Sequence, residues 1–286
     1  MAGLGFLSPA GVTVPDYLEA RVRGDVAVEK RFHRELLLRN GVYRTTREHR
    51  LDDVLPILVE AAREWPSRPV RVLDVACSMG VATVELHGAL VGAGIECETC
   101  GTDLLVGARY VARDDGTGLL FDAVGEPLQA DVTGWATPWR FRRSDRLLRP
   151  ALVTRARRMM SVERDLYAAA LGAPRAGFTV VDVPLLHRST ENVPGLRFRQ
   201  ESLLEPREPG RFALVRAANI LNDDYFAPDV LRTMVERLRE RLEEGGMFFV
   251  ARNVNGEEGT RASWYRQRDG RLVLAGTRQG GAGPRL

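Results

Sequence analysis

The stretch Val70–Gly80, VRVLDVACSMG, decides the fold. Its first part, VRVLDVA, is a short apolar run of the kind that forms a buried parallel strand. The small residues from Cys77 to Gly80 suit a turn, and the apolar residues from Val81 to Val91 recur at helical spacing. Small residues let the backbone approach a ligand closely, and the first turn of a helix has N–H groups without partners inside the helix. The stretch therefore predicts a strand, a ligand-binding turn and a helix.

Strand and helix patterns alternate along much of the remaining chain. We predict further strands at 95–101, 196–200, 212–218 and 247–251, a helix at 104–112, and an amphipathic helix that starts near Pro228 and ends at Gly245-Gly246. Asp269-Gly270 marks a hairpin near the C-terminus. This alternation predicts an α/β fold, a Rossmann-like seven-stranded and mostly parallel sheet with an antiparallel C-terminal hairpin. Ligands of such sheets bind at the carboxyl ends of the strands.

The same patterns divide the chain into four parts. We assign residues 1–66 to an N-terminal helical cap and residues 67–112 with 196–278 to the Rossmann-like core. Residues 113–195 interrupt the alternation and are far longer than an ordinary crossover, so we expect an inserted lid or substrate subdomain. That insert is predicted to begin with a hairpin, to continue as helix and to end as a strand at 178–186. Residues 279–286, rich in glycine, are expected to form a flexible tail.

Composition narrows the class of protein. The chain has 286 residues, of which 44% are hydrophobic and 28% are charged, as in soluble globular proteins. Its apolar runs are too short for a membrane span, and its N-terminus lacks the basic region of a signal peptide, so we expect a cytoplasmic protein. The net charge is +3, and Lys30 is the only lysine among 41 basic residues, so arginine richness by itself is weak support for nucleic-acid binding.

The three cysteines are Cys77, Cys97 and Cys100. They are too few for a disulfide framework. Cys97 and Cys100 form a single CxxC pair with no second ligand pair after it, whereas a zinc site needs about four ligands. We therefore predict buried core cysteines and no metal site.

Polar residues follow the predicted strands where a nucleoside would bind. Asp103 ends the second strand, 23 residues after Gly80, and an acidic residue there can accept hydrogen bonds from both ribose hydroxyls. Asn219 ends the fourth strand and Glu201 follows the third. Each of these residues also has a purely structural interpretation, as a turn residue or a helix cap. Nicotinamide-binding Rossmann domains place an acid similarly, but they require G-x-G-x-x-G, from which residues 76–80 depart.

The segment 74–80, DVACSMG, resembles motif I of the class I S-adenosylmethionine (SAM) methyltransferases, whose usual form is D-V-G-C-G-T-G. Ala76 and Ser78 replace its first two glycines, and Gly80 keeps the third. The resemblance implies that the backbone of 76–80 cradles the methionine part of SAM and that Asp103 holds the ribose. The cofactor-binding residues that it implies are Asp74, Ala76, Cys77, Ser78, Gly80, Asp103, Leu104, Glu201, Ser202, Leu203 and Asn219, with Glu201, Ser202 and Leu203 around the adenine.

Two later segments extend the resemblance. FALVRAANIL at 212–221 is similar to the family's F-D-L-V-x-x-x-x-x-L, and LEEGGMFFV at 242–250 to its L-x-x-G-G turn. The Cys-Ser-x-Gly and Arg-Asn-x-Leu segments of chemotaxis-receptor methyltransferases are closer still, but Ala218 stands where they carry arginine. We therefore do not transfer their activity on receptor glutamates.

The acceptor is less constrained than the cofactor. No N-P-P-Y motif follows the fourth strand, which disfavours the usual amino methylation of nucleic acids. Candidate substrate residues, each of which also has a structural interpretation, are Asn222, Asp223, Tyr225, Trp135, Trp139 and His187. The arginines and tryptophans of 135–164 suit a solvated helix face, a pocket for an anionic or aromatic small molecule, or a surface for nucleic acid or membrane. No catalytic residue is assigned.

The sequence therefore predicts a SAM-dependent methyltransferase that acts on a small molecule. Three alternatives stay open: a non-catalytic module that binds SAM or its demethylated product, a methyltransferase for protein or RNA, and a nicotinamide-dependent Rossmann enzyme. The oligomeric state is not predicted.

Overall fold

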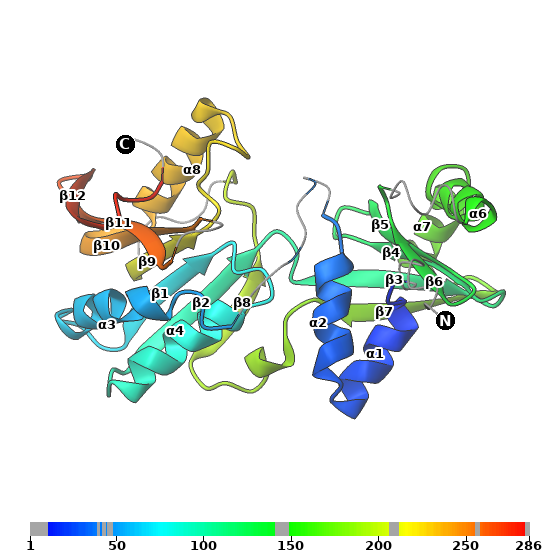
Figure 1. The fold of residues 1–286 in the computed structure, drawn as a ribbon, viewed down its shortest axis with the longest axis horizontal. Coiled ribbons are helices and arrows are strands. Elements are labelled where there is room, and N and C mark those ends of the chain that lie inside the picture. Colours follow the sequence, from blue (N-terminus) through cyan, green and yellow to red (C-terminus); the bar gives the residue numbers. More distant parts are fainter. Residues whose placement is uncertain are drawn as a thin grey trace, which may run out of the picture. The chain divides into compact units, whose positions relative to one another are not determined.

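A computed structural model describes residues 11–38, 41, 44, 48–140, 149–205, 212–254 and 258–283. The chain divides into two compact units, Met1–Thr45 with Gly107–Leu186 and Thr46–Val106 with His187–Leu286. Figure 1 shows the elements of both. The predicted cap at 1–66 contributes to both units, because α1 (Val14–Arg23) and α2 (Val26–Glu35) fall in the first and α3 (Leu55–Arg63) falls in the second.

The second unit contains a seven-stranded sheet in the order β12-β11-β10-β9-β1-β2-β8. Its strands are β1 (Val70–Val75), β2 (Cys97–Asp103), β8 (Leu196–Gln200), β9 (Phe212–Ala218), β10 (Leu242–Asn253), β11 (Thr260–Arg268) and β12 (Arg271–Arg278). The five neighbouring strands β10, β9, β1, β2 and β8 are parallel. The strands β11 and β12 add an antiparallel hairpin beside β10. The chain runs outward from β1 to β2 and β8, and later outward on the other side through β9 and β10. The predicted fold class is confirmed, and the strand order reverses between β1 and β9.

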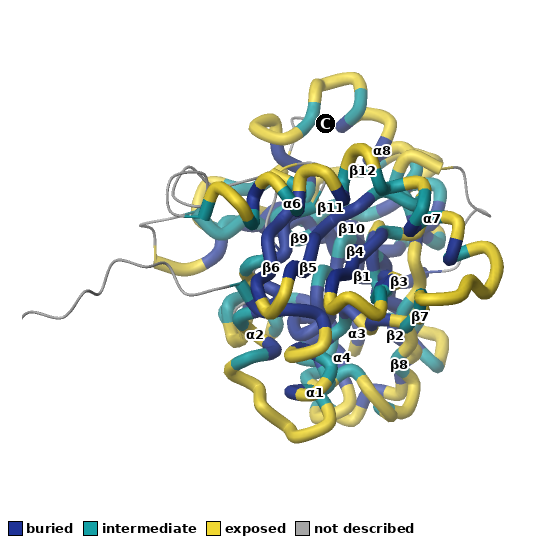
Figure 2. Tube along the Cα trace, turned by 90° about the vertical axis from the view of Figure 1, so that its right-hand side faces the viewer, coloured by how far each residue is buried: buried dark blue, intermediate teal, exposed yellow. Residues whose placement is uncertain are grey.

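Helices cover both faces of this sheet (Figure 1). α3 and α4 (Val81–Gly92) pack on one face, where Leu58 and Leu86 meet Phe249. α8 (Pro228–Glu240) packs on the other, where Leu238 meets Phe248. Successive residues of a strand point to opposite faces, so Phe248 and Phe249 of β10 can both be fully buried. Figure 2 shows the central strands of this sheet as mostly buried.

The first unit contains a five-stranded antiparallel sheet in the order β6-β5-β4-β3-β7. The strands are β3 (Gly107–Arg113), β4 (Thr117–Phe121), β5 (Pro127–Val132), β6 (Trp135–Pro138) and β7 (Phe178–Pro184), and the helices besides α1 and α2 are α6 (Pro150–Ser161) and α7 (Arg164–Gly172). Ala156 of α6 and Tyr167 of α7 pack against Val111 and Phe121 of the sheet. The predicted hairpin, helical part and terminal strand of the insert are all present. Part of the predicted helical segment, residues 141–148, lies outside the described residues.

Two sequence predictions about elements are wrong. The helix predicted at 104–112 is mostly β3, because Tyr110 and Val111 are both buried and fit the two faces of a strand. Gly245-Gly246 does not end α8, which already ends at Glu240. The two glycines lie in β10, where the register with β9 shifts between Leu242 and Met247, and the positive φ of Gly245 suits that irregularity.

The expected tail is described as far as residue 283. There the N–H of Gly281 donates to the carbonyl of Arg278 and the N–H of Ala282 donates to Ser263 Oγ. The first bond joins the described part of the segment to the end of β12, and the second joins it to β11.

Candidate cofactor-binding site

The loop between β1 and α4 has an unusual backbone. Ala76, Ser78 and Gly80 have φ values of 54°, 56° and 79°. Side chains disfavour this left-handed region, and non-glycine residues held there concentrate at functional sites. The N–H of Cys77 donates to the carbonyl of Thr102 at 3.0 Å, which fastens the loop to the end of β2. The loop therefore passes the carboxyl edge of the sheet in a tight turn, at the point where the strand order reverses.

Gly80 is required by space as well as by conformation. A Cβ there would lie 2.7 Å from Thr190 Cγ2 and 2.8 Å from the Phe198 ring. A Cβ on Gly101 would lie 2.5 Å from the same ring. The Phe198 ring thus packs in the space left by two glycines, behind the loop. This explains why the third motif glycine is kept although the first two are replaced.

Asp103 connects the loop to the end of β2. One carboxylate oxygen accepts a hydrogen bond from the Ser78 N–H at 2.8 Å, and the other accepts one from the Leu105 N–H at 3.1 Å. The Asp103 carbonyl accepts from the Glu201 N–H at 2.8 Å. A carboxylate has about four acceptor positions, so two bonds leave capacity for further donors. Leu104, 61% exposed, places an apolar surface beside this half-buried carboxylate.

Asp74 lies behind the loop rather than at its surface. Its carboxylate forms a bidentate ion pair with Arg216 of β9, at 2.8 Å from Nε and 2.7 Å from Nη2. Both side chains are almost completely buried. Thr83 donates to the same carboxylate, and Arg216 Nη2 also donates to the Ala82 carbonyl. The pair therefore fastens β1, β9 and the first turn of α4 together, so Asp74 acts on the loop by positioning it.

Asn219 directly follows β9 and has a φ of 60°. Its Nδ2 donates to Asn253 Oδ1 at 3.1 Å, and the Asn253 N–H donates back to Asn219 Oδ1 at 2.8 Å. This reciprocal pair joins the carboxyl ends of β9 and β10. Asn253 is not among the sequence predictions, because an asparagine at the end of a long strand has no distinguishing pattern.

The residues after β8 form a separate recess. Glu201 is buried and ion-paired with Arg241. Ser202 Oγ accepts from the Leu204 N–H at 3.2 Å, and Leu203 packs against the core on the α8 side. The recess is small and is lined by Glu201, Ser202, Leu203, Glu205, Arg237, Leu238 and Arg241.

The residues predicted at the mouth of β9 form a turn before α8. Asn222 Oδ1 accepts from the Asp224 N–H at 3.1 Å, and the Asn222 carbonyl accepts from the Tyr225 N–H at 3.0 Å. Asp224 is ion-paired with Arg252 at 2.7 Å. Asp223 is exposed, and Tyr225 is 54% exposed. Asn222 thus has the structural role, while Tyr225 offers an exposed aromatic ring at the carboxyl edge.

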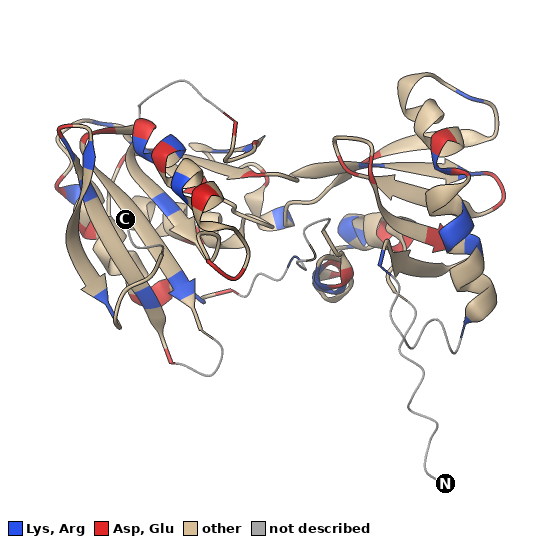
Figure 3. Cartoon of the chain, turned by 90° about the horizontal axis from the view of Figure 1, so that it is seen from above, with Lys and Arg blue, Asp and Glu red and all other residues tan. Residues whose placement is uncertain are grey.

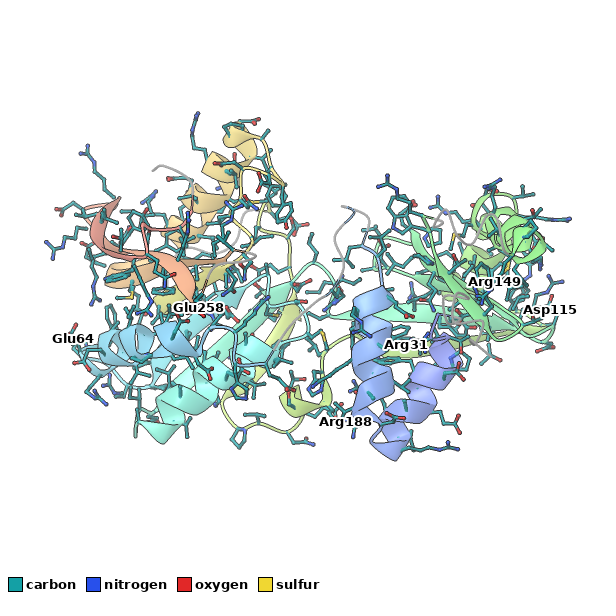
Figure 4. All side chains as sticks on the ribbon, viewed as in Figure 1. Arg31, Glu64, Asp115, Arg149, Arg188 and Glu258 are labelled. Carbon is teal, nitrogen blue, oxygen red and sulfur yellow. The ribbon has the colours of Figure 1, made fainter. Side chains whose placement is uncertain are left out.

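His187 contacts the loop through its backbone. The backbone N–H of His187 donates to the Met79 carbonyl at 2.8 Å. The ring Nδ1 accepts from the Ser189 N–H at 3.2 Å and caps the short helix η2 (Arg188–Thr190). The side chain is buried. Figure 4 labels the neighbouring Arg188. His187 therefore supports the loop from the end of the predicted insert, in a segment that belongs to the same unit as the loop.

The two predicted tryptophans belong to the other unit. Trp135 is buried in the core between the antiparallel sheet and its helices. Trp139 Nε1 donates to the Leu37 carbonyl at 3.2 Å. Both therefore have structural roles within that unit.

Among the described residues of 135–164, Arg155, Arg158 and Arg164 form ion pairs. Arg155 and Arg158 approach Glu163 at 2.6 and 2.9 Å, and Arg164 is paired with Glu126. The hydrogen bond from Arg155 lowers the pKa of Glu163. Asp115, labelled in Figure 4, lies 3.8 Å from Arg155. In the other unit, basic and acidic residues likewise alternate along α8 (Figure 3). These contacts favour the solvated-face interpretation of the arginines.

Cysteines and other residue types that can bind metals were the next candidates for a site. Cys77, Cys97 and Cys100 are free and buried. Within the described part of the chain, no group of three or more His, Cys, Asp or Glu is arranged to hold a metal ion. Across the same residues, no helix combines the length and apolar character needed to traverse a membrane.

Comparisons with known proteins found solved structures that are similar at low sequence identity. No protein-family model matches the chain, and no curated protein matches it. Among solved structures it is similar to the N-methyltransferase NodS from Bradyrhizobium japonicum WM9 in complex with S-adenosyl-L-homocysteine, at 12% identity and a TM-score of 0.35, over 76% of this chain and 69% of that one. It is also similar to the CMeT domain of the citrinin polyketide synthase, at 12% identity and a TM-score of 0.34, over 70% of this chain.

A third similar structure is an O-methyltransferase family protein from Burkholderia thailandensis, at 14% identity and a TM-score of 0.31, over 82% of this chain. The chain spans 34% of the citrinin synthase chain and 43% of the Burkholderia one. Similarity this low does not establish an activity, so the functional argument rests on the site itself. No sequence match supports the closer resemblance to chemotaxis-receptor methyltransferases, which stays a prediction.

Proposed function

We propose that the unit built on the parallel sheet binds SAM and that the protein is a SAM-dependent methyltransferase. One observation carries the proposal: the carboxylate of Asp103, at the end of β2, accepts the N–H of Ser78 in the left-handed loop at the reversal of strand order. This point is where open α/β sheets bind nucleotides. The motif resemblance selects SAM among the possible nucleotides.

The site residues divide into those that contact the cofactor and those that position them. In this proposal the backbone of 76–80 lies along the methionine part, and the spare acceptor capacity of Asp103 takes the ribose hydroxyls. The exposed side chain of Leu104 offers an apolar surface to the adenine. Asp74 holds the loop through Arg216.

The adenine edge is assigned to the segment after β8. The carboxylate of Glu201 is already paired with Arg241, so its part in binding is to orient the backbone of the segment. Ser202 and Leu203 then provide the contacts to the base. Asn219 closes the site at the end of β9, with its side chain fixed by Asn253.

The chemistry asks little of the protein. When bound, SAM would supply a methyl group activated by the sulfonium: the acceptor lone pair would form a bond to the methyl carbon in line with the breaking carbon–sulfur bond, and the sulfur would leave as a neutral thioether. The protein aligns the two reactants and excludes water, and a base is needed only when the acceptor is protonated. A small-molecule acceptor fits the absence of a recognised nucleic-acid module from the sequence.

Isothermal titration of the whole chain with SAM, S-adenosylhomocysteine and NAD tests the proposal. Micromolar binding of the first two and none of NAD is the expected result. Absence of binding by both SAM and S-adenosylhomocysteine would overturn the proposed function and leave the loop a structural turn.

A second candidate is a module that binds SAM without transferring methyl. It is favoured by the commitment of two carboxylates at this site, Asp74 and Glu201, to arginine partners, which removes them as bases. Release of S-adenosylhomocysteine during incubation with small molecules, peptides or RNA separates the candidates. Turnover on peptide or RNA alone would replace the small-molecule assignment.

A further inference from the structure

The strand β7 forms one edge of the antiparallel sheet. Among the described strands, the order β6-β5-β4-β3-β7 leaves β7 bonded to β3 alone (Figure 1). Thr179, Val180 and Asp182 are exposed, and Val180 is one of the large apolar side chains that lie at the surface. Edge strands present rows of free N–H and C=O groups, which another strand can pair with.

The hydrogen bonds around β7 show which of its residues face outward. The Asp114 N–H donates to the Gly177 carbonyl at 3.2 Å, so these two residues form a hydrogen-bonded pair of the β3–β7 ladder. Hydrogen-bonded and non-hydrogen-bonded pairs alternate along an antiparallel ladder. Every second residue from Phe178 onward, which includes Val180 and Asp182, therefore turns its N–H and C=O away from β3.

Both ends of this outward-facing row already have partners. The Phe178 N–H donates to the Arg175 carbonyl at 3.1 Å, and the Pro184 carbonyl accepts from the Tyr17 hydroxyl at 2.6 Å. Pro184 has no N–H of its own, which suits a position turned away from β3. Among the described residues, the Phe178 carbonyl and the middle of the row are left without hydrogen-bond partners.

The charges at the two ends of the row are opposite. Asp182 is exposed, and Arg109, opposite it on β3, donates instead to the Leu171 carbonyl at 3.1 Å. Arg175 is also exposed and lies over the Phe178 ring, with its guanidinium carbon 5.9 Å from the ring centroid. Neither Asp182 nor Arg175 forms an ion pair with another described residue. A strand with an acid at one end and a base at the other is complementary to an antiparallel copy of itself.

The other sheet edges lack this complementarity. The edge strand β12 begins and ends with arginine, at Arg271 and Arg278, and the edge strand β8 carries Arg197 and Arg199. Antiparallel pairing of either strand with its own copy brings arginine against arginine, and like charges opposite each other destabilise a strand pair. The edge strand β6 is joined to Gly11 by a bridge. Within the described part of the chain, β7 is therefore the self-complementary edge.

We propose that β7 binds β7 of a second copy of this chain, antiparallel and about a two-fold axis at Val180. In this register Val180 exchanges hydrogen bonds with Val180 of the second copy, and the Asp182 N–H donates to the Phe178 carbonyl of the second copy. The Asp182 carboxylate then meets Arg175 of the second copy, and the same contact recurs across the axis. A two-fold interface uses the same surface on both copies and closes on itself, so the assembly is a dimer and not a fibre.

The charges select this register over its neighbour. A pair centred on Val181 would also join outward-facing residues, with Val180 opposite Asp182 of the second copy. It would leave the Asp182 carboxylate against an apolar side chain and away from Arg175. Because opposite charges that face each other stabilise a strand pair, the register centred on Val180 is favoured.

Sedimentation equilibrium of the whole chain, without any cofactor, tests the proposal. Wild type is expected to sediment with twice the 31.8 kDa mass of one chain. Asp182→Arg and Arg175→Asp each place like charges at both contacts, so each should weaken dimerisation roughly 100-fold. Asp165→Arg, at an exposed acidic residue of α7, is the matched control and should leave the dimer intact.

Mixing the two charge variants gives the sharpest measurement. In a mixed dimer the new arginine at position 182 faces the new aspartate at position 175, and at the other contact the native Asp182 and Arg175 face each other. Equimolar Asp182→Arg and Arg175→Asp should therefore form a dimer that neither variant forms alone. A folding defect in either variant cannot produce this rescue, and thermal melting of each variant verifies the fold.

Val180→Pro tests the backbone contact by itself. Proline removes the outward N–H of residue 180, which the ladder with β3 does not use, and proline is tolerated at such positions of edge strands. The variant should keep the circular dichroism of wild type and lose the dimer. A folded Val180→Pro variant that dimerises as tightly as wild type would contradict the proposed pairing.

Three further outcomes would overturn the proposal. A wild type that stays monomeric would leave Asp182 and Pro184 as features that keep other strands off the edge. A dimer that both charge reversals leave intact would place the interface elsewhere. Failure of the two folded charge variants to associate when mixed would exclude the two-fold pairing at Val180. Because no cofactor is present, these outcomes are independent of the proposed function.

Discussion

Asp103 is the single residue on which the nucleoside assignment depends most. Its carboxylate holds the Ser78 and Leu105 N–H groups and retains acceptor capacity for the ribose. We expect Asp103→Ala to bind SAM at least tenfold more weakly, because hydrogen bonds to charged groups contribute about 1.5–3 kcal/mol. Isothermal titration measures the change.

Asp103→Asn separates the two roles of this side chain. The amide keeps one acceptor oxygen for the loop but loses the charge, so it should keep more of the melting temperature than alanine while still losing affinity. Unchanged SAM affinity in both variants would refute the ribose assignment.

A second pair of residues, Asp74 and Arg216, determines how stable the unit built on the parallel sheet is. Removing one partner leaves the other charge buried, at a cost of about 3–5 kcal/mol. We therefore expect Asp74→Asn and Arg216→Met each to lower the urea midpoint of the unit built on the parallel sheet. The double variant Asp74→Asn/Arg216→Met should lose less than the two single losses combined. Strict additivity of the losses would show that the two side chains do not act as a pair.

At the scale of elements, Gly80 joins the loop to α4, because it is the last loop residue and the N-cap of the helix. Gly80→Ala adds strain at positive φ and a Cβ within 2.8 Å of Thr190 and Phe198. We expect it to displace the loop and to weaken SAM binding more than tenfold, since loss of even one charged hydrogen bond costs about that much.

Gly94→Ala is the matched control for that change. Gly94 also has a positive φ, 74°, but a Cβ there meets nothing within 4 Å. It should cost about 1 kcal/mol of stability, as expected for an alanine forced into this region, and leave affinity unchanged. Equal effects of the two substitutions on SAM affinity would refute the packing argument.

At the scale of the whole molecule, the two units should respond differently to pH. Asp131 of β5 lies buried in the first unit, where it accepts from the Val14 N–H at 2.7 Å and from Gln129 Nε2 at 2.9 Å. Burial raises the pKa of Asp131 to about 7, from an ordinary value of 3.8. The folded unit therefore binds more protons than the unfolded chain between these values.

Stability of that unit should consequently fall as pH rises from about 4 to about 7 and then level off, because ionisation of the buried carboxyl is costly. Asp131→Asn removes this ionisation, so its stability relative to wild type should improve with pH over the same range. Urea unfolding of the whole chain at several pH values measures the difference. Asp114→Asn, at an exposed position, is the control, and an identical slope in wild type and Asp131→Asn would contradict the prediction.

Much of the fold follows from local patterns. Apolar runs and helical spacing located β1, α4, β8, β9 and the terminal hairpin, because each pattern records which faces of an element are buried. The order of strands and polar strand ends along the chain predicted a candidate site at the carboxyl edge, where the structure brings Ser78 and Asp103 together. The strand β3 was mispredicted as a helix, because a short apolar segment after a strand fits either a helix or a strand until its partners are known.

The sequence by itself determined the strand–turn–helix at 70–91, the Rossmann-like fold class and the acidic residue at the end of β2. Only the tertiary structure decided that residues 1–45 fold with the insert and that Asp74 is paired with Arg216, 142 residues away. The physical reason is that burial periodicity is a local property of the chain. The partner of a buried charge depends instead on which strands become neighbours and in what register, and no single segment encodes that.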